Sequence, residues 1–109
     1  MKTINIAGVE NKVYKEVLDN GLTIYVLPDE TKGITMNLTV KYGSSINDFR
    51  FKGEKEYKHL HLGVAHFLEH LTFKMEDMDA NDYFASLGSD SNAFTTYDHT
   101  NYEVWATSN

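Results

Sequence analysis

The sequence predicts an α+β fold, with an antiparallel or mixed sheet packed against helices, and three features support this prediction. A glycine-containing turn at residues 19–21 separates two extended-looking segments. Apolar and polar residues then alternate strictly over residues 34–41, which is the period of a strand. Residues 63–73, with the sequence GVAHFLEHLTF, are instead typical of a helix that is apolar nearly all round and therefore buried.

The first two strands are expected to form a hairpin. Residues 13–18 and 22–27 should pair, because Asn20-Gly21 supplies the positive φ angles that a tight turn needs. A third strand over residues 34–40 should present one continuous apolar face, made of Ile34, Met36, Leu38 and Val40.

The rest of the chain divides into a loop, a short helix and a second strand pair. Residues 42–62 are polar and have no sustained period, which predicts a long surface loop. Asp79 is a candidate N-cap and Gly88 a C-terminal stop for a short helix. Residues 93–97 and 102–107 are rich in β-branched and aromatic side chains on either side of the sequence DHTN, so we expect an antiparallel pair.

Length and composition limit the function classes. The 109 residues are 41% apolar, which is enough for one compact core, so we expect one domain or part of one. A net charge of −6, without any run of five like charges, gives no reason to expect nucleic acid or anionic lipid as a partner. No window approaches the roughly 18 apolar residues of a membrane span. The absence of cysteine excludes disulfides and favours a cytoplasmic protein.

Three ionisable residues share one side of the predicted helix. His66, Glu69 and His70 fall within a sector of roughly 100°, because offsets of three and four return to one face. If the helix is buried, two imidazoles and a carboxylate need compensating partners. A zinc ion fits, since two histidines one helical turn apart can bind one ion. Glu69 would then lie beside the metal as a general base, because zinc lowers the pKa of its water to about 7.

Other interpretations of the motif and of the remaining candidate ligands stay open. The spacing can arise by chance on a partly exposed helix. A structural zinc site would need four closed protein ligands, and the chain has neither cysteine nor a second histidine pair at ligand spacing. We expect the remaining candidates to be exposed loop histidines, a turn histidine and surface or sheet carboxylates, namely His59, His61, His99, Glu76 and Glu103.

The motif and its surroundings resemble a known family. His66-Phe67-Leu68-Glu69-His70 is similar to the inverted zinc motif His-x-x-Glu-His, and its context resembles the pitrilysin/insulinase family of metallopeptidases. The stretches LDNGLTIYVLPD, YGSSIND, GVAHFLEHLTF and SNAFTTYDHTNYEVWAT occur in the order of that family's N-terminal domain. The resemblance covers residues 14–109 and is greatest to bacterial, apparently cytoplasmic members described as processing proteases. KMED replaces the Gly-Thr that often follows the motif, so no substrate class is assigned.

The resemblance implies a zinc-dependent metalloendopeptidase that hydrolyses peptides or unfolded polypeptide segments. It gives Zn²⁺ the ligands His66 and His70, makes Glu69 the general base, and places the third ligand, a glutamate, beyond Asn109. Family members are several times longer than this chain. We therefore expect residues 1–109 to be one partial N-terminal domain that is inactive alone and needs C-terminal domains or a partner subunit.

The resemblance also implies a substrate-binding strand. In the family, the strand matching Asn92, Ala93, Phe94 and Thr95 is an edge strand to which an extended peptide adds by main-chain hydrogen bonds. An ordinary sheet edge is the alternative for these residues.

Two further expectations concern function and assembly. A relative without catalysis could keep the fold as an assembly or partner-binding subunit, but the intact motif argues against this alternative. Truncation should leave strand edges and apolar side chains open at residues 93–97 or 34–40, so we expect the fragment to form a homo-oligomer.

Overall fold

The computed structural model describes residues 1–30 and 33–107, and these form two compact units, one within Met1–Thr31 and the other within Lys32–Asn109. The described residues contain three antiparallel sheets and two helices, which confirms the α+β prediction. That residues 1–109 belong to one partial domain stays a prediction.

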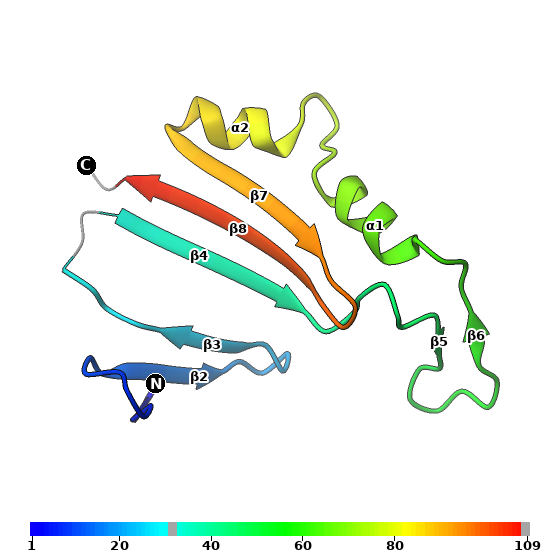
Figure 1. Cartoon of the computed structure of the whole chain (residues 1–109), viewed down its shortest axis with the longest axis horizontal. Coiled ribbons are helices and arrows are strands. Elements are labelled where there is room, and N and C mark those ends of the chain that lie inside the picture. Colours follow the sequence, from blue (N-terminus) through cyan, green and yellow to red (C-terminus); the bar gives the residue numbers. More distant parts are fainter. Residues whose placement is uncertain (31–32, 108–109) are drawn as a thin grey trace. The chain divides into compact units, whose positions relative to one another are not determined.

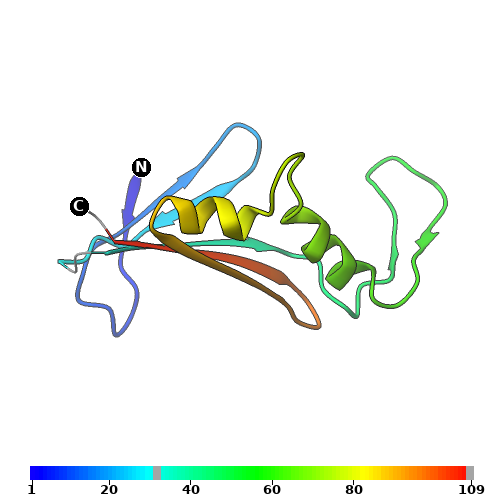
Figure 2. The same cartoon turned by 90° about the horizontal axis from the view of Figure 1, so that it is seen from above.

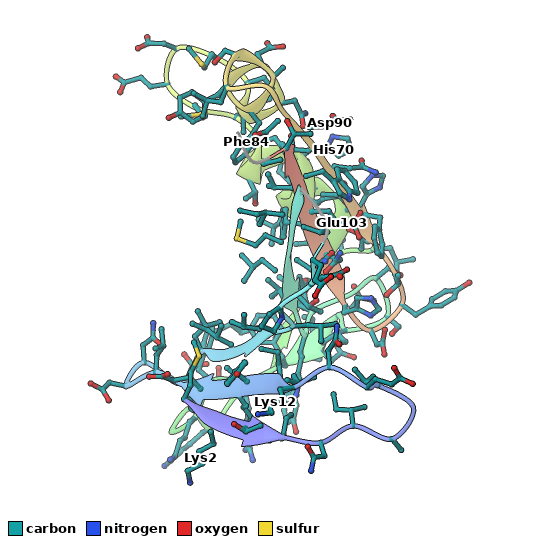
Figure 3. The ribbon with its side chains drawn as sticks, turned by 90° about the vertical axis from the view of Figure 1, so that its left-hand side faces the viewer. Lys2, Lys12, His70, Phe84, Asp90 and Glu103 are labelled. Atoms are coloured by element: carbon teal, nitrogen blue, oxygen red, sulfur yellow. The ribbon has the colours of Figure 1, made fainter. Side chains whose placement is uncertain are left out.

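The first unit is a three-stranded antiparallel sheet. Its strands are β1 (Lys2–Ile4), β2 (Val13–Val17) and β3 (Thr23–Val26), in the order β1-β2-β3. Lys2 and Lys12 of this unit are both exposed (Figure 3). The pairing of β2 with β3 confirms the hairpin that the turn sequence predicts.

The turn of this hairpin differs from the expected one. Gly21 has a φ of +87°, but no other residue type in the described chain has a positive φ, so Asn20 does not adopt the left-handed conformation. Leu18 N–H donates to the Leu22 carbonyl at 2.8 Å, which closes a three-residue loop. In such loops only the last residue is left-handed, and glycine is therefore needed at position 21 alone.

The second unit is built on a longer antiparallel sheet. Its strands are β4 (Gly33–Val40), β7 (Ser89–Thr95) and β8 (Thr100–Thr107), in the order β4-β8-β7 (Figure 1). The third predicted strand is confirmed, and so is the final strand pair. Both strands begin earlier than predicted, and β7 ends at Thr95, two residues before the predicted bound. The hairpin turn is closed by Thr96 N–H, which donates to the His99 carbonyl at 2.8 Å.

Two helices lie alongside β7 on one side of this sheet (Figures 1 and 2). They are α1 (Val64–Thr72) and α2 (Ala80–Ser86). The predicted N-cap is confirmed, because the Asp79 carboxylate accepts a hydrogen bond from Asn81 N–H at 2.9 Å. Neither helix has the length and apolar character needed to cross a membrane.

One face of the sheet in the second unit is turned towards the helices. Ser91 Oγ donates to Asn81 of α2 at 2.7 Å, so alternation along β7 turns Ser89, Ser91, Ala93 and Thr95 towards the helices. Cross-strand partners share a face, and the register therefore places the apolar side chains of β4 on the helix side. These side chains are 44–62% exposed, because the helices contact β7 and β8 and do not cover β4; they are Ile34, Met36, Leu38 and Val40.

The prediction of a buried helix and a compact core is wrong for this chain. In α1 only Ala65 and Glu69 are buried, while Phe67 is 61% exposed. Among the described hydrophobic residues, only Val13 and Ala65 are buried. The reason is geometric, because each sheet is open and the second one carries helices along one edge only.

The segment between β4 and α1 is mostly irregular, as predicted, but it contains one short strand pair. β5 (Asp48–Phe49) and β6 (Lys58–His59) pair antiparallel. Two-residue strands are too short to produce a recognisable period in the sequence.

The start of this segment docks on the β7–β8 turn. Ser44 N–H donates to the Thr96 carbonyl at 2.8 Å, and Ser45 N–H donates to the Tyr97 carbonyl at 2.9 Å. Gly43 is buried at this contact, where an added Cβ would lie 2.5 Å from backbone atoms of the turn. The docking therefore depends on glycine and fixes the end of β7.

Candidate metal centre

Helix α1 carries the candidate ligands and is held against the sheet at its C-terminal end. Gly63, which precedes the helix, has a φ of +89°, a conformation that glycine adopts without strain. At the other end, Thr72 Oγ1 lies 3.2 Å from the Tyr102 hydroxyl, and the Phe73 and Tyr102 rings are 6.0 Å apart. These contacts with β8 fix the helix against the sheet.

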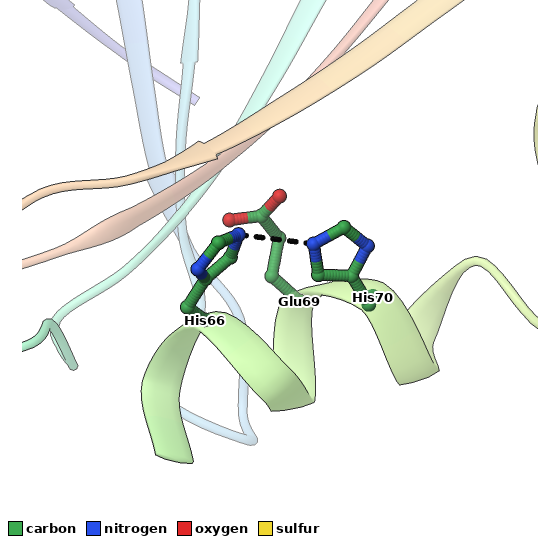
Figure 4. Close-up of side chains that lie close together, drawn as sticks. All are labelled: His66, Glu69 and His70. Carbon is green, nitrogen blue, oxygen red and sulfur yellow. Dashed lines mark hydrogen bonds between the residues drawn. The ribbon is translucent and has the colours of Figure 1, made fainter. Parts of the chain in front are cut away.

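The structure brings His66, Glu69 and His70 together. The two Nε2 atoms lie 2.9 Å apart, and the ring centroids are separated by 4.7 Å (Figure 4). Each residue offers one potential ligand atom, and these atoms all lie within 4.8 Å of one another. In the described part of the chain, no other group of three or more such residues is found. The helical spacing thus produces the expected cluster.

Burial differs sharply among the three residues. Glu69 is only 8% exposed, whereas both histidines are exposed. The expectation that two buried imidazoles need a compensating ion is therefore wrong for this chain. Support for a metal comes from the convergence of the two Nε2 atoms instead, because exposed histidines have no desolvation cost to offset.

Glu69 has a partner on the neighbouring strand. Its Oε2 atom accepts a hydrogen bond from the Thr95 hydroxyl of β7. This bond offsets part of the cost of burying a carboxylate. Among the described residues no hydrogen bond reaches Oε1, which leaves that oxygen available for another partner.

The donor set fits zinc in type and in spacing. Imidazole nitrogens and carboxylate oxygens are ordinary zinc ligands. Two nitrogens bound to one tetrahedral zinc at about 2.0–2.1 Å would be about 3.3 Å apart, so the observed 2.9 Å requires the rings to separate by only a few tenths of an ångström. The described residues do not supply four closed ligands, so the structural-zinc alternative gains no support.

The other histidines lie outside this cluster. In β6, His59 Nδ1 lies 2.5 Å from an Asp48 oxygen, and His61 is exposed. In the β7–β8 turn, His99 Nδ1 lies 2.7 Å from an Asp98 oxygen. Hydrogen bonds from the side chains of His99, and secondarily of Thr96, hold the pKa of Asp98 below its usual range.

The two glutamates that follow the motif in the sequence, Glu76 and Glu103, also lie outside the cluster. Glu103 in β8, labelled in Figure 3, accepts a hydrogen bond from Asn101 Nδ2 at 2.9 Å. Glu76 is exposed in the segment between the two helices. Glu76 is thus a surface carboxylate and Glu103 a sheet carboxylate, and that neither binds metal stays a prediction.

The predicted substrate strand lies at the edge of the sheet. Asn92, Ala93, Phe94 and Thr95 all belong to β7, which is the last strand in the order β4-β8-β7. Within the described residues its outer edge has no paired strand. Ala93 and Thr95 face the helices, whereas Asn92 and Phe94 face the other way. Their role in substrate binding stays a prediction.

The contact of Thr95 with Glu69 was not predicted from the sequence. Alternation along β7 places Thr95 on the same face as Ser91, but only the contact of Ser91 with α2 shows that this face is turned to the helices. The sequence indicated only residues 93–97, and it gave no signal for the facing position on α1.

Comparisons with known proteins agree with this geometry. Residues 28–109 match the family model described as Insulinase (Peptidase family M16). The chain is 39% identical over its whole length to a Bacillus subtilis protein named "Uncharacterized zinc protease YmfH", covering 26% of that protein. It is 31% identical to "Uncharacterized zinc protease ML0855" of Mycobacterium leprae, with 87% of this chain and 22% of that protein covered.

A solved structure shares the fold. The crystal structure described as a "putative M16-like peptidase" from Alicyclobacillus acidocaldarius superposes with a TM-score of 0.82 at 32% identity. The match covers 91% of this chain and 23% of that one. The chain thus spans about a quarter of the length of the relatives that it matches. The family model, the relatives and the shared fold together show that the chain belongs to the insulinase family of peptidases, M16.

Proposed function

We propose that the whole protein is a zinc-dependent metalloendopeptidase that hydrolyses peptides or unfolded polypeptide segments. The observation that carries the proposal is the convergence of the His66 and His70 Nε2 atoms, with the Glu69 carboxylate beside them. Both relatives are named as zinc proteases, which supports the same chemistry.

In this proposal His66 and His70 would hold the ion through Nε2, and Glu69 would accept and donate protons. When zinc is bound, it supplies Lewis-acid activation of the scissile carbonyl and of water. The Glu69 carboxylate accepts a proton from the attacking water and then gives it to the nitrogen of the departing amine. Burial of Glu69 limits competing contacts with bulk water, and the bond from Thr95 holds one of its oxygens in place.

We propose that the substrate binds as an extended strand along β7. An unpaired strand edge offers main-chain donors and acceptors to any peptide, which suits a peptidase that takes unfolded segments. Helix α1 contacts β7, so a peptide on this strand would lie close to the helix that carries the metal ligands. Asn92, Ala93, Phe94 and Thr95 are the residues proposed to contact it.

The metal assignment is tested by replacing one ligand. His66→Ala removes a direct ligand. It should therefore lower zinc affinity by more than the roughly 100-fold that is lost when a residue hydrogen-bonded to a ligand is replaced. The matched control is His61→Ala, because His61 is exposed and lies outside the cluster. Zinc content after dialysis against a buffered zinc solution measures both variants. Equal zinc content in His66→Ala and the control would contradict the assignment.

The 109-residue chain by itself is predicted to be inactive. A catalytic zinc site uses three protein ligands, and if Glu69 serves as the base only two remain among the described residues. We propose that the third ligand comes from further domains or from a partner subunit. Zinc-dependent cleavage of an unstructured peptide by the purified chain, lost in Glu69→Gln, would contradict this prediction.

We also propose that the isolated chain associates with a second copy of itself through β4. This strand has an unpaired edge in the described residues, and its apolar side chains are exposed. Sedimentation at micromolar concentration should show a dimer or larger species. Met36→Lys on the apolar face should shift it to monomer, whereas Thr35→Lys on the opposite face should not. A monodisperse monomer of the unmodified chain would contradict the proposal.

We propose a cytoplasmic location for the whole protein. The composition supports it, because the chain has no cysteine and therefore no disulfide that an oxidising compartment would favour.

A further inference from the structure

The buried carboxylate of Glu69 depends on one hydroxyl. Glu69 is only 8% exposed, and in the described part of the chain its one hydrogen bond comes from Thr95 Oγ1. The bond joins Oε2 of a helix residue to a side chain on the edge strand β7. A glutamate side chain has three rotatable bonds, so an unheld carboxylate on α1 could turn away from the histidines.

The backbone around Thr95 is fixed from two sides. Thr95 pairs with Thr100 in the last rung of the β7–β8 ladder. The next residue, Thr96, accepts a hydrogen bond from Ser44 N–H at 2.8 Å through its carbonyl oxygen. The backbone of Thr95 is therefore held by the strand pairing and by the docked segment after β4, independently of Glu69.

A neighbouring hydroxyl, that of Thr100, does not compete for this bond. Thr100 Oγ1 lies 3.5 Å from Thr95 Oγ1, but its own proton is donated to the Tyr42 carbonyl oxygen at 2.9 Å. Thr95 is thus free to donate its proton to Glu69.

We propose that Thr95 is a positioning residue for the general base, an inference that rests on the proposed function. Its hydroxyl fixes Oε2 of Glu69 and leaves Oε1 to accept the proton of the attacking water. Because Thr95 also belongs to the strand proposed to hold the peptide, the same bond aligns the base with the substrate. Two functions therefore meet at one residue, with the side chain holding Glu69 and the main chain belonging to the substrate strand.

The activity test compares two substitutions of similar size in the whole protein. Thr95→Val removes the hydroxyl and keeps the branched shape, and it should lower kcat about 10- to 100-fold, the effect of a misplaced catalytic group. The KM for an unstructured peptide should stay within about twofold, because the main chain of β7 is unchanged. Thr95→Ser retains the hydroxyl and should restore most of kcat. Zinc content should be equal in all three proteins.

A second readout does not use activity. In the zinc-free protein, a double-mutant cycle joins Thr95→Val with Glu69→Met, which replaces the carboxylate by an apolar chain of similar length. If the hydrogen bond orients Glu69, the change in the unfolding equilibrium constant of the double variant should differ by about fivefold or more from the product of the two single-variant changes. If Thr95→Val does not fold, Thr95→Ala takes its place in both experiments.

The outcomes separate this inference from the proposed function. Wild-type protein without zinc-dependent hydrolysis would overturn the proposed function and this inference with it. Active wild type with an inactive Glu69→Gln variant, but with normal kcat in Thr95→Val, would overturn only the inference. Additive effects of the two substitutions in the double-mutant cycle would also overturn only the inference. Equal losses of kcat in Thr95→Val and Thr95→Ser would have the same consequence.

Discussion

Glu69→Gln in the whole protein is expected to retain zinc and to lose peptide hydrolysis by about 10²- to 10⁴-fold, the usual contribution of a general base. The amide of glutamine cannot accept the proton of water, whereas its carbonyl oxygen can still accept the hydrogen bond from Thr95. The local structure should therefore survive while the proton transfer is lost. Zinc content and the rate of cleavage of an unstructured peptide measure the two effects separately.

The control for this experiment is Glu76→Gln. Glu76 is exposed, and it lies outside the cluster of His66, Glu69 and His70. The same change in charge there should leave both zinc content and rate unaltered. Hydrolysis by Glu69→Gln at the wild-type rate would show that the base is another group.

Gly43→Ala is expected to destabilise the protein by about 3 kcal/mol or more, because an added Cβ would meet backbone instead of a movable side chain. The Cβ would lie 2.5 Å from Tyr97 C, Asp98 N and His99 N, which belong to the β7–β8 turn. To relieve this clash, the segment after β4 must leave the turn and break the hydrogen bonds of Ser44 and Ser45. Chemical unfolding of the variant measures the loss.

Gly33→Ala is the matched control. A Cβ on Gly33 would lie 3.5 Å from the Ala106 carbonyl oxygen, an ordinary contact, and Gly33 does not have a positive φ. Its stability should change by less than about 1 kcal/mol, since the backbone tolerates alanine there. Equal unfolding midpoints for Gly43→Ala and Gly33→Ala would refute the interpretation that Gly43 is needed for close packing.

The strands and helices were largely predictable because their signals are local. The strand from Ile34 to Val40 is recognisable from its own alternation of apolar and polar residues. The N-cap at Asp79 is recognisable from one side chain at the start of the helix. The histidine pair was also predictable, because residues four apart on a helix are neighbours whatever surrounds them.

The burial and the cross-element contacts could not be predicted in the same way. An apolar sequence such as that of α1 shows that burial is favourable, but it does not show which segment supplies the cover, and Phe67 remains exposed here. The bond between Thr95 and Glu69 joins residues 26 positions apart, and it depends on how the helix lies against β7. The close approach at Gly43 likewise depends on a turn distant in the sequence.

The zinc centre is the central claim, and anomalous X-ray scattering at the zinc edge from crystals of the whole protein tests it most directly. One peak is expected about 2.0–2.1 Å from Nε2 of both His66 and His70, with Glu69 beside the ion and still bonded to Thr95. Crystals grown with zinc that show no peak between these two nitrogens, or a peak held by other residues alone, would contradict the account.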